Sequence, residues 1–325
     1  MERPAIYAEG LRKRFGDVQA LDGVDMSVPT GTVLGLLGPN GAGKTTAVRI
    51  LTTILVADAG RAEVLGVDVA TQPHVVRNVI GLAGQYAAVD ENLTGRENLH
   101  LMGRLTHQPQ AGIAPRAEEL LEQFSLADAA DRPVKTYSGG MRRRLDLAAA
   151  LVHRPPVLFL DEPTTGLDTR GRSELWSVIE KLVAGGTTLL LTTQYLEEAD
   201  RLADNIAVVD HGRIIAEGTS DHLKARLGST IIHVELPDGA RLGEAKGLLS
   251  ELGPTDIGED GRSLEVKVLD GSAALLTAVR RLDAAGLEPA AIDVRQPSLD
   301  DVFLTVTGHP AEPESANGTT QETDR

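Results

Sequence analysis

Short apolar runs recur along the first two thirds of the chain and predict buried strands. Each run is too short for a helix, and turn residues separate it from the next. The predicted strands span residues 5–10, 24–28, 32–37, 61–65, 79–83, 157–160, 187–192, 205–210 and 213–217. The last two flank His211 and Gly212, a pair that favours a hairpin. Strands interspersed with helical stretches predict an α/β fold.

Residues 94–151 show helical periodicity instead. Thr94-Gly95-Arg96-Glu97 has the capping-box pattern that begins a helix. A second predicted helix, over residues 116–124, places Leu120, Leu121 and Phe124 on one face. A third is expected over residues 145–151. We therefore expect a helical subdomain over about residues 87–152, inserted between strands of the sheet.

Strand and helix patterns continue beyond Gly218 in a different arrangement. Strands are predicted at residues 231–236, 263–269 and 290–295, and helices at residues 241–252, 273–285 and 298–307. The predicted organisation is a first domain over residues 5–220 and a small α+β domain over residues 228–308, compatible with a βαββαβ arrangement. The second shows no catalytic pattern and is expected to serve assembly or docking. Residues 309–325 lack large apolar side chains and are expected to be disordered.

Composition restricts the classes of protein that fit. Hydrophobic residues at 42% and charged residues at 24% are typical of a soluble globular chain. No cysteine is present, which excludes disulfides and thiolate metal sites. The net charge of −15 argues against binding to nucleic acid or anionic lipid. No apolar run approaches the ~18 residues of a membrane span, so a role at a membrane requires another chain. The basic cluster Arg142-Arg143-Arg144 is expected to be a solvated helix face.

One stretch carries a strong chemical signal. Gly38-Pro39-Asn40-Gly41-Ala42-Gly43-Lys44-Thr45-Thr46 lies between the strand at residues 32–37 and a helix expected over residues 47–55. This is the phosphate-loop pattern in its required strand–loop–helix context. Backbone N–H groups of the loop and the start of the helix form a cradle for a polyphosphate. We expect Lys44 to reach the β- and γ-phosphates and Thr45 to ligate Mg²⁺.

Other candidates follow predicted strands or begin helices. Asp161 and Glu162 come directly after a buried strand, where Asp161 would hold Mg²⁺ and Glu162 would polarise the attacking water. Gln85 ends another strand and is a candidate sensor of the γ-phosphate and Mg²⁺. Ser138-Gly139-Gly140 at a helix start is a candidate second anion site. Phe15 is either a core residue or a face on which adenine stacks.

Together, these pieces resemble the ATP-binding cassette of ABC transporters over about residues 5–218. The resemblance assigns Phe15 to adenine stacking, Gly38 to Thr46 to the Walker A loop, Gln85 to the Q-loop, Ser138 to Gly140 to the signature, Asp161 and Glu162 to Walker B and the catalytic glutamate, Asp168 to the D-loop and Gln194 to the switch. More narrowly, the segments that begin at Tyr137 (YSGGMRRRLD), Leu191 (LTTQYLEEAD) and Leu299 (LDDVF) resemble the daunorubicin/doxorubicin-resistance ATP-binding subunits.

This resemblance implies an ATPase that uses ATP and Mg²⁺, with Thr45, Gln85 and Asp161 near the metal. It implies a subunit of a two-component drug exporter, peripheral at the cytoplasmic face of the membrane and partnered by a separate integral permease. Two copies are expected to pair head to tail as a homodimer. Anthracycline-like drugs, a self-made antibiotic, a lipid and a glycolipid all remain open as substrates. The alternative is a soluble ABC-type ATPase acting on ribosomes or DNA, which the single cassette and the acidic balance disfavour.

Two positions depart from the general cassette pattern. Tyr137 stands where most members have leucine, with little expected consequence. Gln194 replaces the usual switch histidine, so this position can donate a neutral hydrogen bond but cannot carry a proton or positive charge. Glu162 and Gln194 are the expected catalytic residues, and we expect hydrolysis to persist through Glu162 and Mg²⁺.

Overall fold

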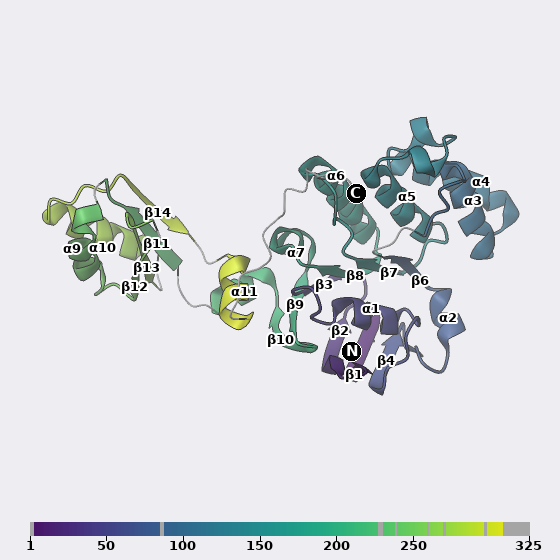
Figure 1. Cartoon of the computed structure of the whole chain (residues 1–325), viewed down its shortest axis with the longest axis horizontal. Helices are drawn as coiled ribbons and strands as arrows, with labels where there is room; N and C mark the ends of the chain where they lie inside the picture. Colours follow the sequence, from purple (N-terminus) through teal and green to yellow (C-terminus); the bar gives the residue numbers. More distant parts are fainter. Residues whose placement is uncertain are drawn as a thin grey trace, which may run out of the picture. The chain divides into compact units, whose positions relative to one another are not determined.

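The chain folds into two compact units (Figure 1). The computed structural model describes residues 3–84, 88–226, 230–237, 239–258, 260–268, 271–295 and 298–307. The first unit ends at Thr219, and the second begins at Ser220. The predicted disordered tail, residues 309–325, lies outside the described residues. Within the described ranges, no helix combines the length and the apolar character needed to cross a bilayer.

An antiparallel sheet opens the first unit, with strand order β2-β1-β4-β5. Its strands are β1 (Ile6–Phe15), β2 (Val18–Val28), β4 (Ala59–Val64) and β5 (Val67–Asp68). β1 and β2 extend well beyond the predicted residues 5–10 and 24–28 to form a long hairpin. The extra residues near the tip are mostly exposed and polar, so hydrophobic alternation does not reveal them.

A six-stranded sheet forms the centre of the first unit, with strand order β10-β9-β3-β8-β7-β6. Its strands are β3 (Val33–Leu37), β6 (Ile80–Ala83), β7 (Val157–Asp161), β8 (Thr188–Thr193), β9 (Asn205–Asp210) and β10 (Arg213–Gly218). All neighbours pair in parallel except β10, which forms the predicted hairpin with β9. The parallel register brings the carboxyl ends of β3, β8 and β7 to one edge of the sheet.

Both faces of this sheet are covered, which explains its continuous apolar runs. Leu158 and Leu160 of β7 face one core cluster, whereas Val157 and Phe159 face the other. The first cluster includes residues of the helical subdomain, and the second includes residues of the antiparallel sheet. The edge at which β3, β8 and β7 end therefore belongs to strands that packing fixes from two sides.

Seven helices, of five to sixteen residues, cover the strands of the first unit in the described part of the chain (Figure 1). They are α1 (Lys44–Leu51), α2 (Pro73–Arg77), α3 (Gly95–Leu105), α4 (Gln110–Gln123), α5 (Gly139–Ala150), α6 (Thr169–Ala184) and α7 (Leu196–Leu202), with short 3₁₀ turns at Ala127–Ala129 and Val134–Thr136. Helices α3, α4 and α5 gather in the helical subdomain.

Helix bounds differ from the prediction for local reasons. α1 begins at Lys44 and ends at Leu51, because Thr53 adopts φ 64 in the left-handed region that terminates helices. α5 begins at Gly139 because the hydroxyl of Ser138 caps it, accepting a hydrogen bond from the Met141 N–H at 3.2 Å. The sequence prediction omitted α6, whose first turns contain no large apolar residue.

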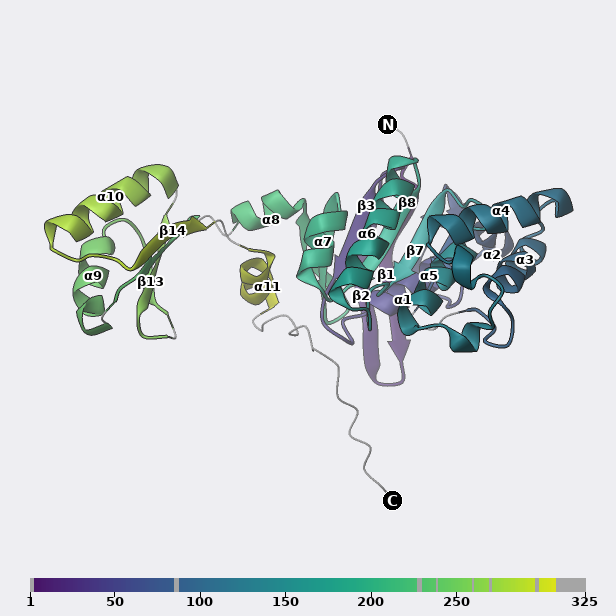
Figure 2. The ribbon, with the colours of Figure 1, turned by 90° about the horizontal axis from the view of Figure 1, so that it is seen from above.

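The second unit contains a four-stranded antiparallel sheet with strand order β12-β13-β11-β14. Its elements are α8 (Ser220–Arg226), β11 (Thr230–Glu235), a 3₁₀ turn (Gly239–Arg241), α9 (Leu242–Leu249), β12 (Thr255–Ile257), β13 (Ser263–Val268), α10 (Gly271–Ala284), β14 (Ala291–Arg295) and α11 (Leu299–Thr307). Helices α9 and α10 lie on one face of the sheet (Figure 2). The βαββαβ order is present, and β12 is the strand that prediction missed.

Candidate functional site

The loop after β3 is shaped by glycines that no other residue could replace without movement. A Cβ on Gly38 would lie 2.2 Å from the carbonyl oxygen of Val209, and one on Gly43 would lie 2.4 Å from that of Ala20. Gly43 also adopts φ 109, in the region that favours glycine. α1 begins at Lys44 of this loop, so the N–H groups of its first turn lie at the loop. The backbone thus forms an anion cradle.

The ammonium group of Lys44 lies over this loop. Lys44 Nζ donates hydrogen bonds to the carbonyl oxygens of Gly38 at 2.7 Å and Pro39 at 3.0 Å. It also lies 3.5 Å from Oε1 of Glu162, and both side chains are buried. The positive charge of Lys44 is therefore held where it would contact an anion bound in the cradle.

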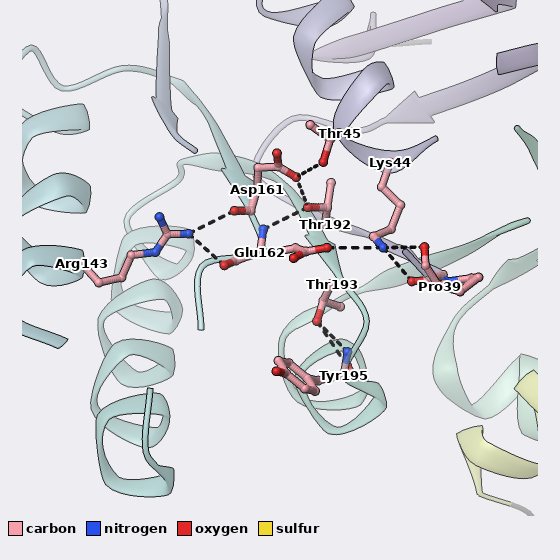
Figure 3. A network of polar contacts seen from close by, with 10 residues as sticks. Pro39, Lys44, Thr45, Arg143, Asp161, Glu162, Thr192, Thr193 and Tyr195 are labelled. Carbon is pink, nitrogen blue, oxygen red and sulfur yellow. Dashed lines mark hydrogen bonds and ion pairs between the residues drawn. The ribbon is translucent and has the colours of Figure 1, made fainter. Parts of the chain in front are cut away.

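Asp161 joins the loop to two neighbouring strands (Figure 3). Its Oδ1 accepts hydrogen bonds from the Thr45 hydroxyl at 3.0 Å and from the Thr192 hydroxyl at 2.6 Å. Thr192 lies opposite Asp161 in the parallel pairing of β7 with β8. The carboxylate and the Thr45 hydroxyl thus form an adjacent pair of oxygen atoms, the type of ligand that Mg²⁺ prefers.

Glu162 has an unusual backbone conformation. Its φ of 50 lies in the left-handed region, which costs an L-residue roughly 1–2 kcal/mol. The Glu162 N–H donates to the hydroxyl of Thr192 at 3.0 Å and to the carbonyl oxygen of Thr192 at 3.1 Å. Such strain persists where surrounding bonds fix the conformation. Here it directs the carboxylate toward Lys44.

The segment after β8 lies beside the loop. The N–H of Gly38 donates to the carbonyl oxygen of Thr193 at 3.3 Å, and the Thr193 hydroxyl accepts from the Tyr195 N–H at 2.9 Å. Gln194 follows Thr193 and is half-buried. Its Oε1 is buried and makes no hydrogen bond within the described part of the chain. The switch position therefore lies next to the anion cradle.

Ser138, Gly139 and Gly140 lie in a different place. They line an open cleft of about 630 Å³ together with Asp168 and other residues of the α6 start. None of the described residues that line this cleft belongs to the phosphate loop. The second candidate anion site is therefore separate from the first within one copy of the chain.

The two remaining candidates have different outcomes. Phe15 ends β1 and is 46% exposed, so its interpretation as a core residue is wrong. Lys13 Nζ lies 5.6 Å from the centre of its ring, and the ring remains accessible. Gln85 lies outside the described residues.

Two residues at the site were missed by sequence reasoning. Thr192 could have been suspected, because a polar side chain in a wholly buried strand needs a partner. The expectation that residues 142–144 form a solvated face is wrong for Arg143, whose side chain is only 10% exposed. Burial lowers the pKa of Arg143, and burial raises the pKa of its neighbour Asp146 to about 6.

Comparisons with known proteins place the chain in a family. The family model of the ABC transporter matches residues 21–165, and that of the C-terminal domain of DrrA1-3-like ATP-binding proteins matches residues 218–307. Daunorubicin resistance ATP-binding protein DrrA3 of Streptomyces coeruleorubidus is 56% identical over 95% of this chain and 97% of its own length. The chain belongs to the DrrA family of ABC-transporter ATP-binding proteins.

Further comparisons agree with this family. The daunorubicin/doxorubicin resistance ATP-binding protein DrrA of Streptomyces peucetius is 51% identical, covering 98% of this chain and 97% of that protein. The solved structure of cbiO1 from Clostridium perfringens, part of the ABC transporter complex cbiONQ, has a TM-score of 0.64 and 27% identity. It covers 70% of this chain and 92% of that one. The resemblance predicted from the motifs is confirmed, and this DrrA-family chain is an ATP-binding ABC-type ATPase.

Proposed function

We propose that this chain is the ATP-hydrolysing subunit of a two-component exporter, which powers efflux of anthracycline-like drugs through a separate membrane permease. One observation carries the enzymatic part: Lys44 of the phosphate loop lies 3.5 Å from the Glu162 carboxylate at the end of β7. The drug-resistance part is supported by relatives that match nearly the whole chain, including its C-terminal unit.

The nucleotide fits the residues present. The Gly38–Thr46 cradle offers N–H donors to phosphate oxygens, and Lys44 can exchange its loop carbonyls for the β- and γ-phosphates. The exposed ring of Phe15 offers a face to adenine. Thr45 and Asp161 would hold Mg²⁺, which neutralises charge on the phosphates when bound. Gln85 is proposed to join them.

Hydrolysis would then depend on two side chains of this copy. Glu162 is positioned as the general base that takes a proton from the attacking water. Gln194 would orient the γ-phosphate through a neutral amide hydrogen bond, because it cannot take a proton as histidine does. The products are ADP and phosphate.

The separation of the two anion sites supports a homodimer. Ser138, Gly139 and Gly140 of one copy would complete the site made by Gly38 to Thr46 of another, so that ATP favours the closed pair and hydrolysis releases it. The closing pair would move an integral permease, with this chain peripheral at the cytoplasmic face of the membrane. A soluble ATPase acting on ribosomes or DNA is the alternative, and the net charge of −15 disfavours it.

The role of Glu162 is tested by Glu162→Gln in the full chain. We expect ATP turnover to fall by about 100-fold or more, while the Kd for ATP stays within about threefold. ATP-bound dimers should then accumulate in size-exclusion chromatography. Glu180→Gln, a change at a surface ion pair with Arg201, is the matched control. Wild-type turnover in folded Glu162→Gln would refute the assignment.

The transport role is tested by expressing the chain with the permease encoded beside it in a drug-sensitive host. We expect association of the two proteins and a lower cellular content of doxorubicin, both of which require ATP turnover. Efflux of a labelled lipid without any change in doxorubicin content would identify a different substrate class. Co-purification with ribosomes instead of the permease would favour the alternative function.

A further inference from the structure

Arg143 on α5 binds backbone carbonyls at the ends of two sheet strands. Its Nε donates to the carbonyl oxygen of Pro163 at 2.7 Å, and its Nη2 donates to those of Asp161 at 3.0 Å and Glu162 at 2.9 Å. Its Nη1 donates to the carbonyl oxygen of Gly84, at the end of β6. A guanidinium group has five donors in a planar fork, so it can hold several carbonyls at once.

These contacts surround the strained residue of the site (Figure 3). Carbonyls on both sides of Glu162 are bound by Arg143, while its N–H is bound by Thr192. The N–H and the carbonyl oxygen of Glu162 are therefore both hydrogen-bonded, and these bonds hold its left-handed conformation. Without Arg143, the turn could relax toward a commoner conformation and the carboxylate would leave its place opposite Lys44.

We propose that Arg143 is a positioning residue, which holds the Glu162 carboxylate in the orientation needed for hydrolysis. This inference rests on the proposed role of Glu162 as general base. In the described part of the chain, the hydrogen bonds of Arg143 go to the carbonyls of residues 161–163 and of Gly84 and none goes to the phosphate loop, so it acts through the backbone.

Asp146, one turn along α5, holds Arg143 in place. Its Oδ2 lies 3.6 Å from Arg143 Nη1, and its Oδ1 accepts a hydrogen bond from the Ala88 N–H at 2.6 Å. Both side chains are buried, and the charge of Arg143 attracts the Asp146 carboxylate. α5 begins with the Ser138–Gly140 anion site, and Arg143 lies on the same helix. A shift of this helix would therefore be transmitted to the Glu162 backbone of the same copy.

The experiment compares Arg143→Gln and Arg143→Lys with wild type in the full chain. We expect kcat to fall by about tenfold or more, while KM and the Kd for ATP stay within about twofold, because the cradle is unchanged. Arg143→Lys should recover little, since one ammonium group cannot span four carbonyls. Arg154→Gln, at an exposed ion pair with Glu119, is the matched control.

A double-mutant cycle separates positioning from a general structural effect. In a Glu162→Gln background, Arg143→Gln should lower the residual rate by less than about twofold, because no carboxylate remains to be positioned. The proposal is overturned if Arg143→Gln lowers the rate by the same factor in the Glu162→Gln background as in the wild-type chain. It is also overturned if Arg143→Gln weakens ATP binding by as much as it lowers the rate. If Arg143→Gln does not fold, Arg143→Lys and Asp146→Asn are subject to the same criteria.

The experiments distinguish a failure of the general-base role of Glu162 from a failure of the positioning role of Arg143. If Glu162→Gln turns over ATP at the wild-type rate, the proposed role of Glu162 is refuted. If Glu162→Gln is slow but folded Arg143→Gln keeps the wild-type kcat, only the positioning role is refuted. A crystal structure of Arg143→Gln gives an independent readout: we expect φ of Glu162 to leave the left-handed region, and an unchanged φ would contradict the inference.

Discussion

Asp146 is a buried carboxyl group whose ion pair only partly offsets its loss of hydration. Burial raises its pKa from an ordinary value of 3.8 to about 6, although the Ala88 N–H and the Arg143 charge both act to lower it. Burial prevails because Arg143 lies 3.6 Å away and the near oxygen, Oδ2, has no hydrogen bond within the described residues. The folded state therefore holds this proton more tightly than the unfolded state does.

This difference predicts a pH dependence of stability. The folded pKa is raised, so the contribution of Asp146 is present in full below about pH 4 and is lost as the pH rises through about 6. Asp146→Asn removes the titration and keeps an oxygen for the Ala88 N–H. Relative to wild type, we expect the free energy of unfolding of the variant to rise between these pH values, by up to about 3 kcal/mol at 1.36 kcal/mol per pKa unit.

Urea unfolding at several pH values measures this change, followed by the fluorescence of Trp176, the chain's single tryptophan, which is buried in the same unit. Asp128→Asn, at an exposed position, controls for the loss of one negative charge. A constant difference between Asp146→Asn and wild type across the pH range would contradict the assignment.

At the scale of elements, local signals begin the helices around the site. α3 begins at a capping box: the Thr94 hydroxyl accepts from the Glu97 N–H at 3.1 Å, and the Glu97 carboxylate accepts from the Thr94 N–H at 2.8 Å. The hydrogen bond from the Thr94 backbone is the main cause that lowers the pKa of Glu97. This helix start was predicted from four consecutive residues, because its donors and acceptors lie within one turn.

Thr94→Ala tests the contribution of this cap. We expect it to lower the free energy of unfolding of the first unit by about 1 kcal/mol, since the Glu97 N–H loses its acceptor. Thr94→Ser keeps the hydroxyl and should lower it by less than half as much. Urea unfolding monitored through Trp176 gives both values. Equal losses in the two variants would show that the methyl group, and not the cap, stabilises this site.

At the scale of the molecule, each unit has a buried core of its own. Two clusters lie on the faces of the central sheet in the first unit, and a third lies between the helices and the sheet of the second. All described residues discussed for the ATP site belong to the first unit. Compact units with separate cores can fold alone.

A chain ended at Thr219 should therefore fold and bind ATP with a Kd within about threefold of the full chain. Its unfolding midpoint in urea, read from Trp176, should remain close to that of the full chain. A chain ended at Ala184 is the control, because it lacks β8 and β9 from the middle of the sheet. Aggregation of the 219-residue chain, or loss of its ATP binding, would contradict the independence of the first unit.

Sequence alone determined the phosphate loop, the α/β class, the order of the motifs and the mixed strand and helix character of the second unit, although it missed β12. Each of these follows from a pattern of consecutive residues: glycines beside a lysine, apolar runs that form strands, or a capping box. Errors occurred where local patterns are weak, as in the exposed half of the β1–β2 hairpin and the polar start of α6.

Only the tertiary structure decided how the sheet edge that carries Glu162 is held. Arg143 is one of three consecutive arginines, and nothing local distinguishes it from its neighbours. Its acceptors are up to 59 residues away in the chain, and Thr192 meets Glu162 across 30 residues. Such contacts arise from parallel strands whose ends meet at one edge, and they depend on packing from both faces of the sheet. The sequence identifies candidate residues of this site, but the fold determines which side chains hold Glu162 in place.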